Sequence, residues 1–181
     1  MFEIDVSQAL VNASVAFEAL RSLIFAIALL VGVVIFIKGV KYCIVISNTN
    51  GPGVVTPSKA IWHLIFGALF AAFSFTISAP WNTFATTEAN TSIVAYNMPG
   101  TDGVPEIYKE VIVAALKFIQ LVGYCFAFHG MILAMKAFAG ESNGSGESPT
   151  MSATWRFMGG LGCINIGPFL LGVSALFTGS S

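Results

Sequence analysis

The chain has 181 residues, of which 56% are hydrophobic and only 9% are charged, and its formal net charge is -1. A soluble domain carries about 25% charged residues, so most of this chain has too little polar surface to face water. The near-zero net charge excludes the basic surface typical of proteins that bind nucleic acid directly. Composition therefore predicts an integral membrane protein.

The N-terminal segment is predicted to form an amphipathic helix, which either lies at the membrane interface or extends the first span. Glu3 and Asp5 precede the first apolar run, where a cleaved secretory signal would be basic, so we expect this run to be retained as a helix. The hydrophobic residues that recur at helical spacing are Val6, Ala9, Leu10, Ala13 and Phe17.

Four apolar stretches reach the roughly 20 residues that a membrane-spanning helix needs. They are residues 22–46, 60–79, 111–135 and 158–177. Pro80 is expected to end the second stretch, whereas Asp102 and Pro105 signal the start of a helix that runs into the third. The fold class expected is an all-α integral membrane protein with about four transmembrane helices as two tandem helical hairpins, plus the N-terminal amphipathic helix.

These stretches define a single membrane domain, 1–181, with three parts. Residues 1–79 form the first hairpin with its N-terminal helix, 80–110 an acidic connector, and 111–181 the second hairpin. Lysine and arginine cluster beside the two hairpin loops, and cytoplasmic loops carry an excess of these residues. We therefore expect both hairpin loops to be cytoplasmic, and both termini and the 80–110 connector to be periplasmic, with the protein in a bacterial inner membrane.

The two halves of the chain resemble each other. Val31-Gly32 and Lys38-Gly39 match Val122-Gly123 and His129-Gly130, and Ala60, Trp62 and Gly67 match Ala153, Trp155 and Gly160. The offset is 91 residues before each loop and 93 after it. The similarity reflects either a duplicated hairpin, in which both copies have the same orientation, or a chance likeness between two apolar hairpins.

The segment GGLGCINIGPF, residues 159–169, is predicted to pack against another helix. Its glycines allow close approach, which drives helix association in lipid. Asn165 is expected to hydrogen-bond across that contact, and Pro168 frees a backbone carbonyl that needs a partner inside the protein. The predicted packing residues are Gly159, Gly160, Gly162, Asn165 and Pro168.

The sequence does not predict an enzyme, a metal site or an organic cofactor. It contains no HExxH, GxSxG or Walker motif, and no carboxylate lies within an expected span for acid–base chemistry. Of the basic groups inside spans, His129 is expected to be neutral and bonded to a backbone carbonyl, and Lys117 to extend to the interface.

The longer segment GGLGCINIGPFLLGVSALFTG, residues 159–179, resembles the C-terminal hydrophobic segment of the IcmC/DotE proteins of type IVB secretion systems, to which the TraQ proteins of IncI-type conjugation systems are similar. The Gly159-Gly160 pair, the run 163–166 (CINI) and Phe169 carry the match, which covers about 20 residues. The resemblance implies a small inner-membrane component of a secretion or conjugation apparatus. It implies no catalytic residues.

The expected function is thus a structural subunit of such an apparatus, acting in the inner membrane or polymerised as a conjugative pilus. Its partners would be further copies of itself, other components of the apparatus and membrane lipid. In a pilus, five basic residues would form a ring that contacts the phosphate of a structural phospholipid; otherwise they simply extend to the membrane interface. These residues are Lys38, Lys41, Lys59, Lys136 and Arg156. The alternative function is a small membrane channel or transporter.

Overall fold

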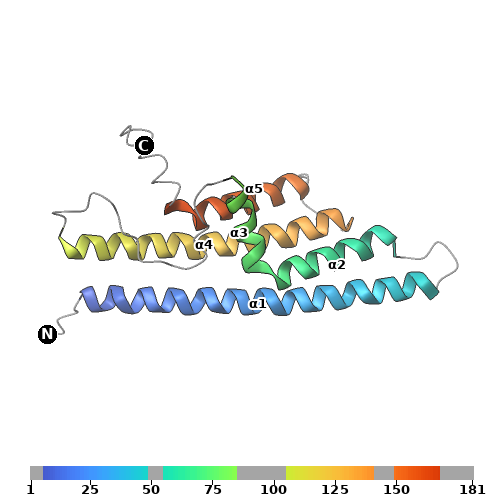
Figure 1. The fold of residues 1–181 in the computed structure, drawn as a ribbon, viewed down its shortest axis with the longest axis horizontal. Coiled ribbons are helices and arrows are strands. Elements are labelled where there is room, and N and C mark those ends of the chain that lie inside the picture. The colour runs from blue at the N-terminus through green and yellow to red at the C-terminus, as the bar shows by residue number, and fades with distance from the viewer. Residues whose placement is uncertain (1–5, 49–54, 85–104, 141–148, 168–181) are drawn as a thin grey trace.

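The computed structural model shows an all-helical chain and describes residues 6–48, 55–84, 105–140 and 149–167 (Figure 1). Within these ranges it contains five helices and no strand. The helices are α1 (Val6–Asn48), α2 (Pro57–Ala71), α3 (Phe73–Phe84), α4 (Glu106–Phe138) and α5 (Pro149–Ile164).

The predicted N-terminal amphipathic helix is not a separate element, because it forms the first turns of α1. This helix has 43 residues and, at 1.5 Å per residue, is about 65 Å long, roughly twice the thickness of a bilayer core. Lys38 and Lys41 do not interrupt it. The first expected span therefore lies within one continuous helix that is longer than a bilayer core is thick.

The second expected span is bent, since α2 and α3 meet at an angle of 89°. The hydroxyl of Thr76 donates to the carbonyl oxygens of Leu69 and Ala72, at 2.9 Å and 3.1 Å. Pro80 does not end the helix, because α3 continues through it to Phe84.

The third expected span is present as α4, which begins directly after Pro105. At its C-terminal end, Gly140 adopts a left-handed φ of 71°, the conformation that commonly terminates a helix. The fourth expected span is described only in part, as the 16 residues of α5; residues 168–177 lie outside the described ranges.

Two helices, α1 and α4, are long and apolar enough to cross a membrane, and the bent pair α2–α3 makes a third if it counts as one span. The structure therefore agrees with an all-α membrane protein but does not show four spans. The connector between the hairpins is also shorter than expected, since α3 ends at Phe84 and α4 starts at Glu106.

The two hairpins have the same orientation. α1 and α4 run in the same direction, and α2 and α5 return antiparallel to them (Figure 1). The ends of the helices that lead into both hairpin loops consequently lie at one end of the molecule. An aromatic core holds the hairpins together, with Phe25 and Phe73 packed edge-on against Tyr124 and Phe128 respectively.

Candidate functional site

The first hairpin is closed by glycines at which two helix backbones touch. A Cβ atom on Gly32 would lie 2.5 Å from the backbone nitrogen of Ala71, and a Cβ on Gly67 would lie 2.7 Å from the nitrogen of Phe36. Real Cβ atoms do not approach backbone this closely, so only glycine fits at these positions. We call this contact between α1 and α2 the first glycine seam.

A second glycine seam joins α4 and α5. A Cβ on Gly160 would lie 2.5 Å from the nitrogen of Ala127, and one on Gly123 would lie 2.8 Å from the carbonyl oxygen of Gly160. A Cβ on Gly130 would lie 2.6 Å from the nitrogen of Phe157. Close backbone approach of this kind provides the van der Waals contact that holds helices together in lipid.

The two seams have the same register. The nearest atoms to a Cβ on Gly32 belong to Ala71 and Gly67, and those for Gly123 belong to Cys163, Gly160 and then Ile164. Gly32 and its counterpart Gly123 are 91 residues apart, and the residues that they contact, Gly67 and Gly160 or Ala71 and Ile164, are 93 residues apart. These are the offsets seen in the sequence. The internal similarity thus extends from residue types to backbone contacts, which supports a duplicated hairpin.

The other predicted packing residues of α5 are placed differently. Gly159 and Gly162 have no atom within 4 Å of an added Cβ among the described residues, so they face outward. Asn165 is 1% exposed, but its Nδ2 donates to the carbonyl of Leu161 in its own helix at 3.0 Å, rather than across a helix contact as expected. Pro168 lies outside the described residues.

Asn165 bonds locally because an asparagine at a helix end reaches the carbonyl four residues earlier. Its Oδ1 is buried and has no hydrogen-bond partner within the described ranges.

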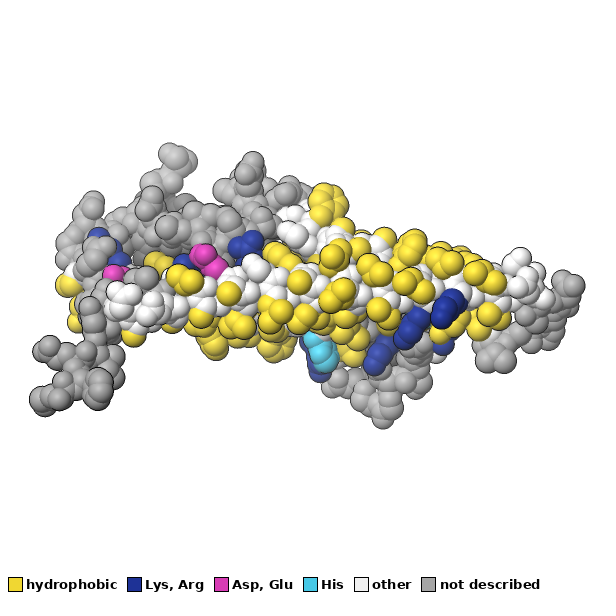
Figure 2. Space-filling model, turned by 90° about the horizontal axis from the view of Figure 1, so that it is seen from below, with side chains coloured by type: hydrophobic (Ala, Val, Ile, Leu, Met, Phe, Trp, Pro, Cys, Tyr) yellow, Lys and Arg dark blue, Asp and Glu magenta, His cyan; other side chains and the backbone are white. Residues whose placement is uncertain are grey.

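The predicted phosphate-contacting residues all lie in the half of the molecule that leads to the hairpin loops. Figure 2 shows basic side chains in both halves of this face, whereas the acidic ones of the described residues appear only in the half opposite the hairpin loops. Lys38, Lys41 and Arg156 are exposed, and Lys59 and Lys136 are half-buried. Among the described side chains of known burial, the only carboxylates, those of Glu18 and Glu110, are in the N-terminal parts of α1 and α4.

His129 contacts a side chain and not the backbone carbonyl that we expected. Its Nε2 lies 2.6 Å from Nη1 of Arg156 across the α4–α5 seam. Since a guanidinium can only donate, this imidazole nitrogen must be the acceptor. The pair lines a surface pocket of about 280 Å³ together with Cys125 and Phe126.

Each hairpin has one histidine and one basic residue at counterpart positions. His63 corresponds to Arg156 at the offset of 93, and Lys38 corresponds to His129 at the offset of 91. His63 is buried, with Nδ1 2.7 Å from the carbonyl oxygen of Lys59, and its ring lies edge-on to Tyr42.

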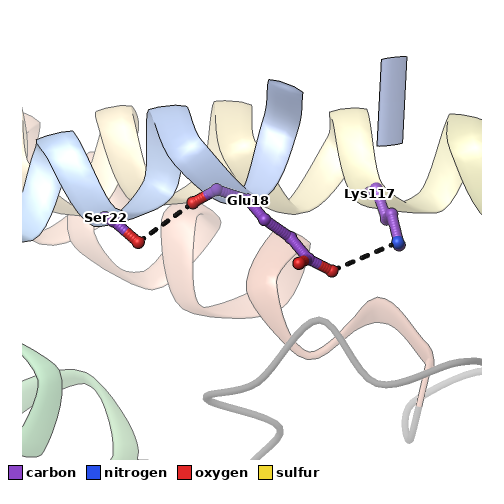
Figure 3. A network of polar contacts seen from close by, with 3 residues as sticks. All are labelled: Glu18, Ser22 and Lys117. Atoms are coloured by element: carbon purple, nitrogen blue, oxygen red, sulfur yellow. Dashed lines mark hydrogen bonds and ion pairs between the residues drawn. The ribbon is translucent and has the colours of Figure 1, made fainter. Parts of the chain in front are cut away.

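Lys117 forms an ion pair that joins α4 to α1, whereas sequence alone predicted that it extends to the interface. Its Nζ lies 3.4 Å from Oε1 of Glu18, and Ser22 Oγ donates to the backbone oxygen of Glu18 (Figure 3). The lysine side chain is only 12% exposed. The sequence did not predict this pair, because Glu18 precedes the first apolar stretch and only the continuity of α1 brings it level with Lys117.

Comparisons of the chain with protein-family models, with curated proteins and with solved structures gave no match. Among the described residues, no three His, Cys, Asp or Glu side chains form a group that could hold a metal ion.

We call the end of the molecule beside the hairpin loops, with Lys38, Lys41, Lys59, Lys136 and Arg156, the basic end. It leads to a prediction about topology. Because Lys and Arg concentrate beside cytoplasmic loops, a cysteine in place of Ser145 should be protected from a membrane-impermeant maleimide in intact cells, and one in place of Asp102 should react. Both cysteines should react after the membrane is opened, which controls for accessibility. Labelling of Ser145→Cys alone in intact cells would mean that the orientation is inverted.

Proposed function

We propose that this chain is a structural subunit of a type IVB secretion or conjugative DNA-transfer apparatus, in the inner membrane or polymerised as a pilus. The observation that carries the proposal is the pair of glycine seams, which build two hairpins by backbone contact while large apolar side chains stay exposed along α1. Such surfaces need lipid or protein around them. The resemblance of residues 159–179 supports the assignment to this type of apparatus.

The polar groups within the helices support a structural role in preference to catalysis. Lys117 pairs with Glu18, and Arg156 with His129, and each pair joins two helices. The ion pair and the charge-assisted hydrogen bond each fix the position of one helix against another. We propose no catalytic residue and no cofactor.

Anionic phospholipid is the lipid partner that the basic end favours. Basic side chains near a membrane surface gain about 1 kcal/mol each from anionic headgroups. Lys38, Lys41 and Arg156 are exposed and therefore accessible to a headgroup. In an assembled pilus these residues would hold structural phospholipid, whereas in an inner-membrane complex lipid would exchange freely around them.

The alternative, a channel or transporter, needs polar side chains that line one path. Its candidates do not converge: Lys38 is exposed on α1, and His129 pairs with Arg156. Asn165 lies nine residues beyond Arg156 on the chain, about 13 Å along a helix at 1.5 Å per residue. The arrangement of these residues therefore favours the structural subunit.

Electron microscopy of the purified protein tests the proposed function directly. Rings or filaments made of this chain are the expected result. Monomers or dimers that conduct ions or solutes in proteoliposomes would instead establish the alternative. Mass spectrometry of lipid extracted from the assemblies then separates the two forms, because a pilus should retain a fixed ratio of anionic lipid after detergent washing.

A further inference from the structure

The second hairpin packs against the first in a way that is not two-fold symmetric. α4 lies against both α1 and α2, with Tyr124 edge-on to Phe25 and Phe138 stacked on Trp62 at 4.6 Å. If a two-fold axis related the hairpins, α5 would contact α1 as α4 contacts α2. However, α1 and α5 have no comparable contact. The hairpins are therefore stacked head to tail, an arrangement that uses two different surfaces.

One of these surfaces is the face of α4 that docks on the first hairpin. Met131 and Met135 follow Tyr124 and Phe128 at helical spacing on this face. Tyr124, Met131 and Met135 are each at most 8% exposed. Their counterparts on α1, 91 positions earlier, are Val33, Val40 and Ile44, which are between 40% and 54% exposed. The chain thus carries a second copy of the docking face, and this copy is open.

The other surface is the groove between α1 and α2 that receives α4. Its aromatic wall includes Trp62 and Phe66, whose counterparts on α5 are Trp155 and Gly159. Trp155 is 69% exposed, and no described atom lies within 4 Å of a Cβ built on Gly159. The groove between α4 and α5 therefore repeats the first groove, with glycine where the first has phenylalanine, and has no helix of the described chain in it.

We propose that the groove between α4 and α5 receives α1 of a second copy of this chain, in the same way that the groove between α1 and α2 receives α4 within the chain. The apolar stripe Val33, Val40 and Ile44 docks there. The outward face of Gly159 and Gly162 allows close approach of the incoming helix. Because the two surfaces differ, each added copy presents the same open groove, and the assembly closes as a ring or grows as a filament.

This interface rests on the proposed function, because both require that the chain assembles with itself. It adds which two surfaces meet. The ion pair within the chain is not repeated at this interface, because Glu18 and Lys117 correspond to Lys109 and Ala26. The counterparts of Arg21 and Tyr124, whose guanidinium and ring are 6.0 Å apart, are Ile112 and Val33. Ile112 of one copy and Val33 of the next copy should therefore lie close together.

Cysteine cross-linking in membranes tests this contact. In a chain whose Cys43, Cys125 and Cys163 are replaced by serine, one copy carries Val33→Cys and another carries Ile112→Cys. A short bismaleimide should give a covalent dimer when both chains are co-expressed, and none from either chain alone. A chain that carries both substitutions should give a ladder of trimers and larger species.

Val34 provides the matched control. It is 54% exposed, but its counterpart Cys125 is also exposed, so it lies off the docking face. Co-expressed Val34→Cys and Ile112→Cys chains should give little product. Equal cross-linking through Val33 and Val34, or a dimer from Val33→Cys alone, would overturn the inference. A stable oligomer with no product from the Val33–Ile112 pair would overturn the inference alone, whereas a monomer in native mass spectrometry would also overturn the proposed function.

Discussion

Alanine in place of Gly160 is expected to lower the free energy of unfolding of the solubilised subunit by about 3 kcal/mol, the upper end of the usual cost of overpacking. The new Cβ would lie 2.5 Å from the backbone nitrogen of Ala127. Backbone cannot move aside as a flexible side chain can, so α5 must shift away from α4 along the whole seam. Unfolding by a denaturing detergent, followed by circular dichroism, measures the change.

Gly162→Ala is the matched control, because Gly162 lies two residues away in the same helix and a Cβ there meets no described atom within 4 Å. Alanine favours helix over glycine by up to about 1 kcal/mol, so this variant should be neutral or slightly more stable. Gly32→Ala should reproduce the loss in the first hairpin, where the equivalent distance is also 2.5 Å. Equal stability of the Gly160 and Gly162 variants would contradict the close contact between α4 and α5.

Glutamine in place of Glu18 should destabilise the subunit by about 1–2 kcal/mol, between the values for exposed and for buried ion pairs. Lys117 is 12% exposed and Glu18 is 53% exposed, so the substitution leaves a mostly buried ammonium group without its charge partner. An unpaired buried charge costs more than the absence of both charges. The double variant Glu18→Gln with Lys117→Met should therefore recover most of the lost stability.

The same unfolding experiment on both single variants and the double variant forms a double-mutant cycle. Lys41→Gln serves as a control, since it removes an exposed basic residue from the other end of α1 without affecting this pair. Additive losses in the cycle would show that Glu18 and Lys117 do not interact, and that α1 and α4 have a different axial register.

The sequence alone was sufficient for the features that depend on short segments. With 9% charged residues, the chain was predicted to be a membrane protein and therefore helical, because lipid requires every backbone group to be satisfied within its own segment. The structure has helices long and apolar enough to cross a membrane. The glycines at matched offsets, Gly32 and Gly67 against Gly123 and Gly160, predicted that the two hairpins correspond position by position. Both features follow from local composition and spacing.

Only the tertiary structure decided how these helices are used. The bend at Ala72 has no proline or glycine to mark it, and a hydrogen bond from Thr76 to a carbonyl seven residues earlier accompanies it. The pair Glu18–Lys117 joins residues 99 positions apart, and its formation depends on the length of α1 and its axial register against α4. Spacing also could not show which glycines of α5 face inward. With 3.6 residues per turn, Gly160 and Gly162 lie on different sides of the helix, and only the packing shows which side meets α4. The ion pair and the orientation of the glycines depend on the helices that pack alongside. The sequence of one segment does not specify those neighbouring helices.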